Sequence, residues 1–344
     1  MTCFKILKQW DNPDSFWLAL QKLTQVLPYF ESSYSRSSLA FYKSYWVQSQ
    51  GSNSFKVKDL SSIITIDEIP FFGFIGYLLE TDSKTYLNAF QVPGICIEAL
   101  NLSRQQSKII RNFLDNEILN QSAEVTLKDP LISNQAMFST DHLMFKSNNF
   151  KYQFKFRRHI NLLDSEEAIK SRLRERFKSL INSGLRDFDI SLHYGDNIDF
   201  KVIQAFRDLH IKEAGRETRS IDTWKKQFEA IKCKEAFCLV SCIDEEIVSA
   251  GYFSVSDRHC YYGSSASRRD MFDKPLFHAI MWKAILFAKS IGACVFDTGE
   301  DYCISNFSDT STAIVSEKEK NIANFKAGFG GKIVSSIIFN SHFC

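Results

Sequence analysis

The sequence lacks a long apolar run. Its longest strongly apolar stretch is FFGFIGYLL, residues 71–79, which is much shorter than the ~20 residues that a membrane-spanning helix needs. The N-terminal segment mixes Lys5 and Lys8 with apolar residues and leads into no apolar run, so it does not look like a secretory signal. We therefore expect a cytoplasmic protein without a transmembrane segment.

A strong net charge is also missing. The chain has 42 Lys and Arg residues against 40 Asp and Glu residues, a net charge of +2. No overall field therefore favours nucleic acid or membrane, and such a partner must be met by a local patch. The nine cysteines are odd in number and scattered, which favours reduced thiols over a disulfide framework. Neither His259–Cys260 nor the pair Cys238 and Cys242 has the spacing of a zinc site, so we expect no metal site.

What the chain does have is enough length for two domains. Its 344 residues are more than one hydrophobic core commonly serves. A mixed, polar stretch at 120–150 separates two patterned parts of the sequence. We therefore predict one domain over residues 1–148 and a second over residues 149–344.

The first part predicts two helices and two strand regions. Asn12 and Pro13 are suited to begin a helix. The aromatic segment 39–47 and the apolar segment 64–80 indicate strands, and 103–119 indicates a second helix.

The second part has a clearer order of elements. A strand at 150–162 precedes a basic helix that we expect to begin near Asp164 and to stop at Gly184. The remaining predicted elements, in chain order, are helices at 199–214 and after Asp222, strands at 236–243, 247–255 and 260–267, a long helix at 275–291, a strand at 294–299, a short helix from Glu317 and a strand at 332–339. This order predicts an α+β fold with a mixed sheet and helices against it.

Four segments of the second part resemble one superfamily. They are EEAIKSRLRERFKSLINSG, then FRDLHIKEAGR before an aromatic helix, then YYGSSAS followed by a helix and FDTGE, and finally NIANFKAGFGG. The order of these segments and the amino acids in them resemble the GNAT acetyltransferase superfamily. Within it, they resemble the Fem-type (FemAB-like) peptidyl and aminoacyl transferases and their BioF2-like acetyltransferase relatives. The matching segments cover residues 150–335.

The resemblance implies two GNAT-like domains, each a mixed, mostly antiparallel sheet flanked by helices, with a degenerate domain at the N-terminus. It implies transfer of an acyl or aminoacyl group to an amine of a cell-envelope precursor or amino sugar. The donor would be aminoacyl-tRNA or acyl-coenzyme A, and no cofactor would be bound permanently. The acceptor, a nucleotide- or lipid-linked sugar or peptide, and the oligomeric state stay open.

Two residues are the catalytic candidates. Acyl transfer to an amine develops an oxyanion that a fixed positive charge can stabilise, and the resemblance places Lys326 of the Phe-Lys motif near the reacting ester. Asp297 ends an apolar strand, where it could orient the acceptor amine or take its proton. The alternatives are a solvated helix lysine and an aspartate that caps a turn.

Several arginines are candidates for binding the anionic parts of a substrate. On one helix, Arg172 and Arg176 would project together, four residues apart. Arg216 and Arg219 lie in the loop GRETR. Guanidinium groups suit phosphate and carboxylate, although charge runs also form ordinary solvated faces.

Tyr262 and Arg268 complete the substrate-binding candidates. Tyr261 and Tyr262 must point to opposite faces of their strand, and Tyr262 would line the acyl site or pack in the core. Arg268 lies in SRRDMFDKPLF, residues 267–277, where coenzyme-A-dependent relatives have a glycine-rich loop and this chain has no glycine. The absence of this glycine-rich loop weakens the coenzyme A alternative. A coenzyme-A-dependent N-acetyltransferase and a non-catalytic GNAT-like binding protein are the rival functions.

Overall fold

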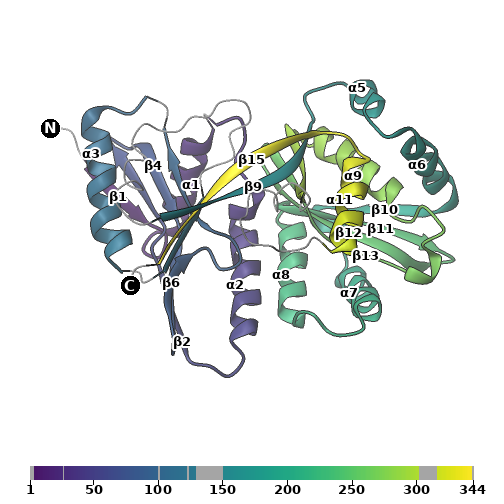
Figure 1. Ribbon diagram of the computed structural model, residues 1–344, viewed down its shortest axis with the longest axis horizontal. Helices are drawn as coiled ribbons and strands as arrows, with labels where there is room; N and C mark the ends of the chain where they lie inside the picture. Colours follow the sequence, from purple (N-terminus) through teal and green to yellow (C-terminus); the bar gives the residue numbers. More distant parts are fainter. Residues whose placement is uncertain are drawn as a thin grey trace. The chain divides into compact units, whose positions relative to one another are not determined.

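The computed structural model describes residues 4–25, 27–99, 101–121, 124–128, 150–301 and 316–342. The chain forms two compact units (Figure 1). Unit 1 contains residues 1–30, 49–155 and 335–344, and unit 2 contains residues 31–48 and 156–334. Three segments thus lie outside the simple division at 148/149, because 31–48 belongs to unit 2 and both 149–155 and 335–344 belong to unit 1.

Unit 1 is built on a mixed sheet with the strand order β1-β3-β4-β7-β8-β15. Its last strand, β15 (Lys332–His342), begins in unit 2. β8 runs parallel to β6 and β7, and the other pairs are antiparallel. Its elements are β1 (Phe4–Lys8), α1 (Pro13–Thr24), β2 (Phe55–Asp59), β3 (Ser62–Ile66), β4 (Ile69–Ile75), β5 (Tyr77–Thr81), β6 (Thr85–Asn88), β7 (Gly94–Glu98), α3 (Arg104–Phe113), the π-helical turn η2 (Leu114–Ile118), η3 (Leu119–Gln121) and β8 (Glu124–Lys128).

The predicted start of α1 is confirmed. The Asn12 side-chain oxygen accepts a hydrogen bond from the Ser15 amide at 3.2 Å, and Pro13 occupies the first turn. Proline is tolerated there because its missing N–H has no partner inside the helix. Phe16, Leu20 and Leu23 are buried on one side of α1.

The predicted strand at 39–47 is wrong. This segment lies in a helix, α2 (Arg36–Gln50), which follows the short turn η1 (Ser32–Tyr34). The Ser35 hydroxyl accepts a hydrogen bond from the Ser38 amide at 3.2 Å and so caps the helix. Leu39 and Trp46, seven residues apart, are both buried, which is helical rather than strand spacing. The aromatic content of the segment suggested a strand, but the Ser35 cap and the helical spacing of the buried residues favour a helix.

Unit 2 is also α+β. Its sheet has the order β9-β14-β13-β12-β11-β10, with β13 and β14 parallel and the other pairs antiparallel. The elements are β9 (Phe150–Asn161), α5 (Glu166–Ser171), α6 (Glu175–Asp187), β10 (Asp189–His193), η4 (Gly195–Asn197), α7 (Phe200–Ala214), α8 (Ile221–Lys232), β11 (Ala236–Ile243), β12 (Glu246–Ser256), β13 (His259–Ser267), η5 (Arg269–Met271), α9 (His278–Ser290), β14 (Val295–Glu300), α11 (Glu317–Ala327) and β15 (Lys332–His342). The predicted fold class, α+β with mixed and mostly antiparallel sheets, is confirmed.

Both faces of the unit 2 sheet are covered by helices (Figure 1). Along β11, Phe237 and Leu239 pack into a core with α6 and α9, whereas Cys238 and Val240 pack into a second core with α7 and α8. Alternating side chains of one strand point to opposite faces of a sheet. An apolar run such as AFCLVSCI therefore marks a strand that is buried on both sides.

The single basic helix that we predicted is two helices. The chain breaks between Ser171 and Glu175, where the Arg174 amide donates to the Gly328 carbonyl at 2.9 Å. Arg172 and Arg176 therefore lie on different sides of a break and do not share one helical stripe. The predicted stop at Gly184 is also wrong, because α6 continues to Asp187.

Gly184 instead lies where α6 meets α9. A Cβ at this position would lie 2.9 Å from the Ala279 Cβ and 3.2 Å from the Pro275 carbonyl oxygen. Only a glycine permits this close approach of the two helices. Among the described helices, none is both long and apolar enough to cross a membrane.

Replacing Gly184 by alanine tests this packing role. In an open helix, Gly→Ala is stabilising by about 1 kcal/mol. Here we expect Gly184→Ala to lower the free energy of unfolding by about 1–3 kcal/mol, since the added methyl overpacks the contact with Ala279. Urea unfolding measures this change. Ser179→Ala, at an exposed site of the same helix, is the control and should be neutral or slightly stabilising, and a stabilised Gly184→Ala variant would contradict the packing role.

Candidate functional site

Three neighbouring strands of unit 2 bring a set of polar side chains to one face of the sheet. Asp297 of β14 lies opposite Tyr261 of β13 and His159 of β9. Residues two apart on a strand share a face, so Arg157 joins His159 and His259 joins Tyr261. No sequence pattern groups these residues, because β9 is far from β13 and β14 along the chain.

Asp297 is the centre of this cluster. It is fully buried, and its Oδ2 lies 2.7 Å from Arg157 Nη2 and 3.5 Å from Nε2 of both His159 and His259. Its Oδ1 accepts the Gly299 amide at 2.6 Å. Burial acts to raise the pKa of Asp297, but Arg157 and the two imidazoles outweigh it and hold that pKa well below its usual value.

Arg157 links Asp297 to a second carboxylate. Arg157 Nη1 lies 3.6 Å from Glu31 Oε2, and Glu31 immediately precedes η1. The guanidinium also lies over the Tyr261 ring, with its carbon 4.9 Å from the ring centroid. Burial lowers the pKa of Arg157, but Asp297 and Glu31 more than reverse this effect and raise it. Arg157 is therefore a permanent cation with two carboxylate neighbours.

The hydrogen bonds of His259 indicate its protonation state. Its Nδ1 lies 3.2 Å from the Ser32 amide, which can only donate. We therefore assign the proton of a neutral ring to Nε2, which faces Asp297. Burial lowers the pKa of His259, although Asp297 opposes this. The neutral form fits both contacts.

The three groups His159, His259 and Asp297 have their ligand atoms within 4.8 Å of one another, as a metal site would. However, Arg157 already binds the Asp297 oxygen that both imidazoles face. A divalent cation there would be repelled by the guanidinium. We therefore interpret the cluster as an ion-pair network.

Lys326 comes from α11, whose start is fixed by a capping box between Ser316 and Glu319. It lies in the last turn of this helix and is only 8% exposed. Its Nζ donates to the Glu300 carbonyl, at the end of β14, at 3.2 Å. Burial lowers the pKa of Lys326 to about 8, even though Asp297 favours the charged form.

Two glycines make room for this arrangement. Gly299 has φ +90°, and a Cβ there would lie 3.0 Å from Lys326 Nζ. Gly331 also has φ +90°, and its Cβ would lie 2.6 Å from the His159 carbonyl oxygen. Residues other than glycine rarely adopt this backbone conformation, because their Cβ is crowded there. The glycines after Lys326 therefore let the chain turn from α11 into β15 directly against β9.

The structure places Lys326 and Asp297, the two predicted catalytic residues, close enough for the Asp297 charge to act on Lys326. Of the predicted arginines of the basic helix, Arg172 forms an ion pair with Asp164. It is the neighbouring Arg174 that contacts α11, where it donates to the Asn324 carbonyl at 3.3 Å. Arg176 is exposed in the first turn of α6.

Arg219 has a different environment from the neighbouring Arg216. Arg216 is exposed, but Arg219 is only 6% exposed. Its guanidinium carbon lies 3.9 Å from the Trp224 ring centroid and 5.6 Å from that of Phe41. Within the described part of the chain it makes no ion pair with a carboxylate, and its Nη2 is buried without a hydrogen bond. Burial lowers the pKa of Arg219 to about 10.

Two other predicted residues are engaged elsewhere. Tyr262 packs against Phe253 and Phe277, and its hydroxyl meets that of Ser265. Arg268 pairs with Asp270 at 2.6 Å and with Glu246 at 3.1 Å. Strand alternation had indicated that one tyrosine of the pair would face the site, and it is Tyr261 that contacts Arg157.

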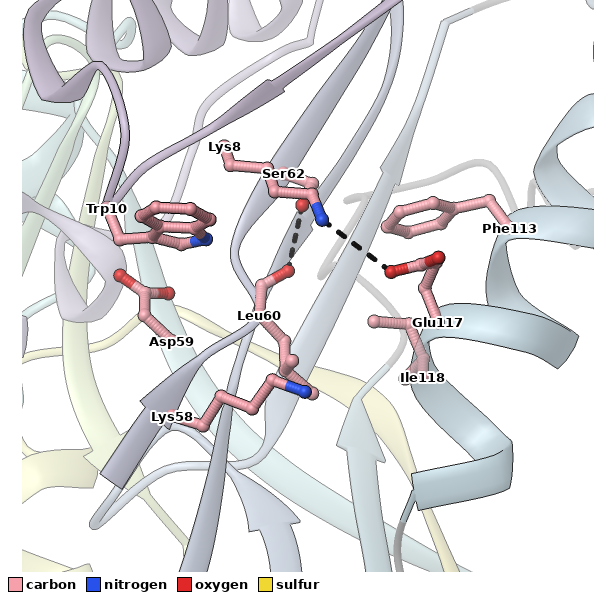
Figure 2. A pocket seen from close by; sticks show the side chains of 9 residues that line it. All are labelled: Lys8, Trp10, Lys58, Asp59, Leu60, Ser62, Phe113, Glu117 and Ile118. Carbon is pink, nitrogen blue, oxygen red and sulfur yellow. Dashed lines mark hydrogen bonds and ion pairs between the residues drawn. The ribbon is translucent and has the colours of Figure 1, made fainter. Parts of the chain in front are cut away.

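Unit 1 has a pocket of its own, which none of the predicted residues lines. It has a volume of about 200 Å³, and Trp10 and Phe113 lie on opposite sides of it with Lys8 and Ser62 between them (Figure 2). An ion pair of 3.7 Å between Lys8 and Glu117 crosses this space.

Comparisons with known proteins agree with this architecture. No family model and no curated protein matches the sequence, but solved structures do match the fold. FemX matches with a TM-score of 0.59 and 11% identity over 86% of this chain and 90% of that one. A tandem GNAT protein from the clavulanic acid biosynthesis pathway matches with a TM-score of 0.52 and 8% identity over 100% and 99%. L-PGS from Bacillus licheniformis matches with a TM-score of 0.50 and 9% identity over 78% and 81%. The fold is thus similar to that of GNAT-fold proteins.

The ion-pair network predicts a stability effect at Asp297. Replacing it by asparagine keeps the shape but leaves Arg157 buried with one carboxylate fewer. We expect Asp297→Asn to lower the free energy of unfolding by about 3–5 kcal/mol, as measured by urea denaturation. Asp187→Asn, which breaks an exposed pair with Arg186, should change it by less than about 0.5 kcal/mol. A loss below about 1 kcal/mol for Asp297→Asn would show that the network does not depend on this charge.

Proposed function

We propose that unit 2 transfers an acyl or aminoacyl group to an amine, carried by a cell-envelope precursor or an amino sugar. The observation that carries the proposal is Lys326 of α11, which is 8% exposed and whose Nζ donates to the Glu300 carbonyl at the end of β14, in a GNAT-like fold. The likeness to FemX and to the tandem GNAT protein supports the reaction class. A cytoplasmic location is part of the proposal.

In this reaction the acceptor amine attacks the donor carbonyl directly. A C–N bond forms and the carbonyl oxygen becomes an oxyanion. The C–O or C–S bond to the leaving group then breaks, and the proton that the amine loses passes to the leaving oxygen or sulfur, which departs as the hydroxyl or thiol. Protonated Lys326 would stabilise the oxyanion, because a preformed charge in a dry site costs little reorganisation. A negative charge that develops nearby also favours the charged form of Lys326, so the interaction is stronger in the transition state than before it.

Asp297 has an electrostatic role in this proposal. A proton acceptor for an amine needs a pKa near the working pH, whereas the pKa of Asp297 is held well below its usual value by Arg157 and the two imidazoles. Asp297 is also fully buried. We therefore propose that it helps to keep Lys326 charged rather than taking the proton itself.

Arg219 is our proposed anchor for an anionic group of the substrate. A buried guanidinium without a carboxylate partner is unfavourable in the free protein. A phosphate or carboxylate that binds it bidentately would remove this cost and make two strong hydrogen bonds. The flanking rings of Trp224 and Phe41 hold the guanidinium flat for such contact. Arg172, Arg176 and Arg216 are exposed, and as ligands for phosphate they remain secondary candidates.

The proposed donor is aminoacyl-tRNA, with acyl-coenzyme A as the alternative. The loop 267–277 has no glycine, and Arg268 within it is already paired with Asp270 and Glu246. Calorimetric titration with acetyl-coenzyme A separates the two donors. One-to-one binding in the micromolar range would favour coenzyme A, and no binding at millimolar concentration would leave aminoacyl-tRNA. A protein that binds donor but turns over with neither would be a non-catalytic binding protein.

Lys326 predicts both a loss of activity and a pH profile. We expect Lys326→Met to reduce kcat at least about 100-fold with charged tRNA or acyl-coenzyme A as donor, because one preformed oxyanion contact is removed. In the parent, kcat should fall as the pH rises through about 8, where Lys326 loses its proton. Lys326→Arg should retain some activity and lose this fall. Lys320→Met removes an exposed lysine of the same helix. It should leave kcat and its pH dependence unchanged. A rate that rises through pH 8 would instead indicate a neutral lysine acting as a base.

Arg219 predicts opposite changes in stability and binding. Arg219→Gln should leave the melting temperature unchanged or raise it, because a buried charge without an anionic partner is removed. The same variant should weaken binding of the productive substrate by at least about tenfold, since a charge-assisted contact is worth about 1.5–3 kcal/mol. Arg216→Gln is the matched exposed control. A strongly destabilised Arg219→Gln variant would indicate that the guanidinium serves the packing of Trp224.

A further inference from the structure

A second cavity lies in unit 2, and none of the residues of the proposed reaction lines it. It has a volume of about 340 Å³, which is within the usual range of small-molecule sites. Its walls come from α5, α6 and α9, and the residues that line it include Lys170, Leu173, Lys178, Ile181, Leu185 and Trp282. Neither Lys326, Asp297 nor Arg219 is among these residues.

The floor of this cavity is apolar. Leu173, Ile181 and Trp282 contribute side chains that are otherwise buried in the core of the unit. Leu185 extends the apolar surface outward and is 41% exposed. Leu173 lies in the break between α5 (Glu166–Ser171) and α6 (Glu175–Asp187), so the floor spans the junction of these two helices. The floor therefore suits a hydrocarbon chain or ring rather than a polar group.

The rim of the cavity is basic. The lining includes three lysines, Lys170, Lys178 and Lys283, but only one carboxylate, that of Glu166. Lys178 Nζ pairs with Glu175 at 2.7 Å, but this pair is at the surface, where ion pairs are weak and easily exchanged. Lys283 Nζ donates to the Ile190 carbonyl at 3.1 Å and has two more protons to donate. The ammonium groups are therefore available to an incoming anion.

We propose that this cavity binds a small anionic amphiphile, with one alkyl or aryl part on the apolar floor and a phosphate or carboxylate at the lysines. The charge of the rim disfavours a cationic ligand, and a neutral one would leave the lysine contacts unused. The site is independent of the proposed transfer reaction, so either proposal can fail without the other.

Decyl phosphate below its micellar concentration is the probe. We expect saturable, one-to-one binding by calorimetry, and a change in tryptophan fluorescence that Trp282→Phe abolishes. Decanol, which has the same chain without the charge, should bind at least about fivefold more weakly because the contacts with the lysines are lost. Titration of the full chain at two salt concentrations should show weaker binding of decyl phosphate at high salt.

Two variants separate the floor from the rim. Leu185→Glu places a charge at an exposed position of the floor and should weaken binding at least about tenfold through lost burial and repulsion. The double variant Lys170→Gln, Lys178→Gln should weaken it about three- to tenfold, and Lys225→Gln, on the exposed side of α8, should not. The proposal is overturned by non-saturable binding, by equal binding of decanol, or by a fluorescence change that persists in Trp282→Phe.

Discussion

The ion pair between Asp297 and Arg157 is the interaction on which unit 2 depends. A carboxylate buried in the middle of a sheet is costly unless a cation and hydrogen bonds compensate it. Arg157 supplies the cation from the neighbouring strand, at 2.7 Å. That guanidinium is itself largely buried, and its second carboxylate is Glu31, just before η1. The charge of Asp297 thereby ties the segment 31–48 to unit 2, although more than 100 residues of unit 1 follow that segment in the chain.

The same pair sets the properties of Lys326. Arg157 and a protonated Lys326 balance Asp297 and Glu31, so an additional cation in the cluster would be unfavourable. This accounts for the neutral state of His259, whose Nδ1 accepts from the Ser32 amide. It also accounts for the pKa of Lys326, which is about 8. Burial and Arg157 lower this pKa, while Asp297 raises it. A site that is nearly neutral before reaction can respond to a new negative charge without rearrangement, as catalysis of acyl transfer requires.

The fold class and most elements could be predicted from the sequence, because apolar periodicity and caps are local signals. Ser316 with Glu319 and Asn12 with Pro13 are examples. The segment 39–47 could not, since its aromatic residues fit strand and helix alike and the Ser35 cap decided the outcome. Gly184 looked like a helix stop because the sequence does not show that Ala279 packs against it. Lys326 and Asp297 were proposed from their motifs, and the structure places them within electrostatic reach of each other. Arg157, His159 and His259 were missed because only the register of β9, β14 and β13 brings them together.

Arg219 shows how burial separates residues that the sequence cannot rank. Arg216 and Arg219 belong to one five-residue loop, yet one is exposed and the other is 6% exposed between two aromatic rings. The side chain of Arg157 is 16% exposed and lies in a cluster with two carboxylates, so its charge is satisfied within the protein. Arg219 has aromatic faces instead, which offer a cation less than an ion pair does. The buried charge of Arg219 therefore does not stabilise the fold unless an anion binds to it. Because of this difference we propose substrate binding for Arg219 and structural support for Arg157.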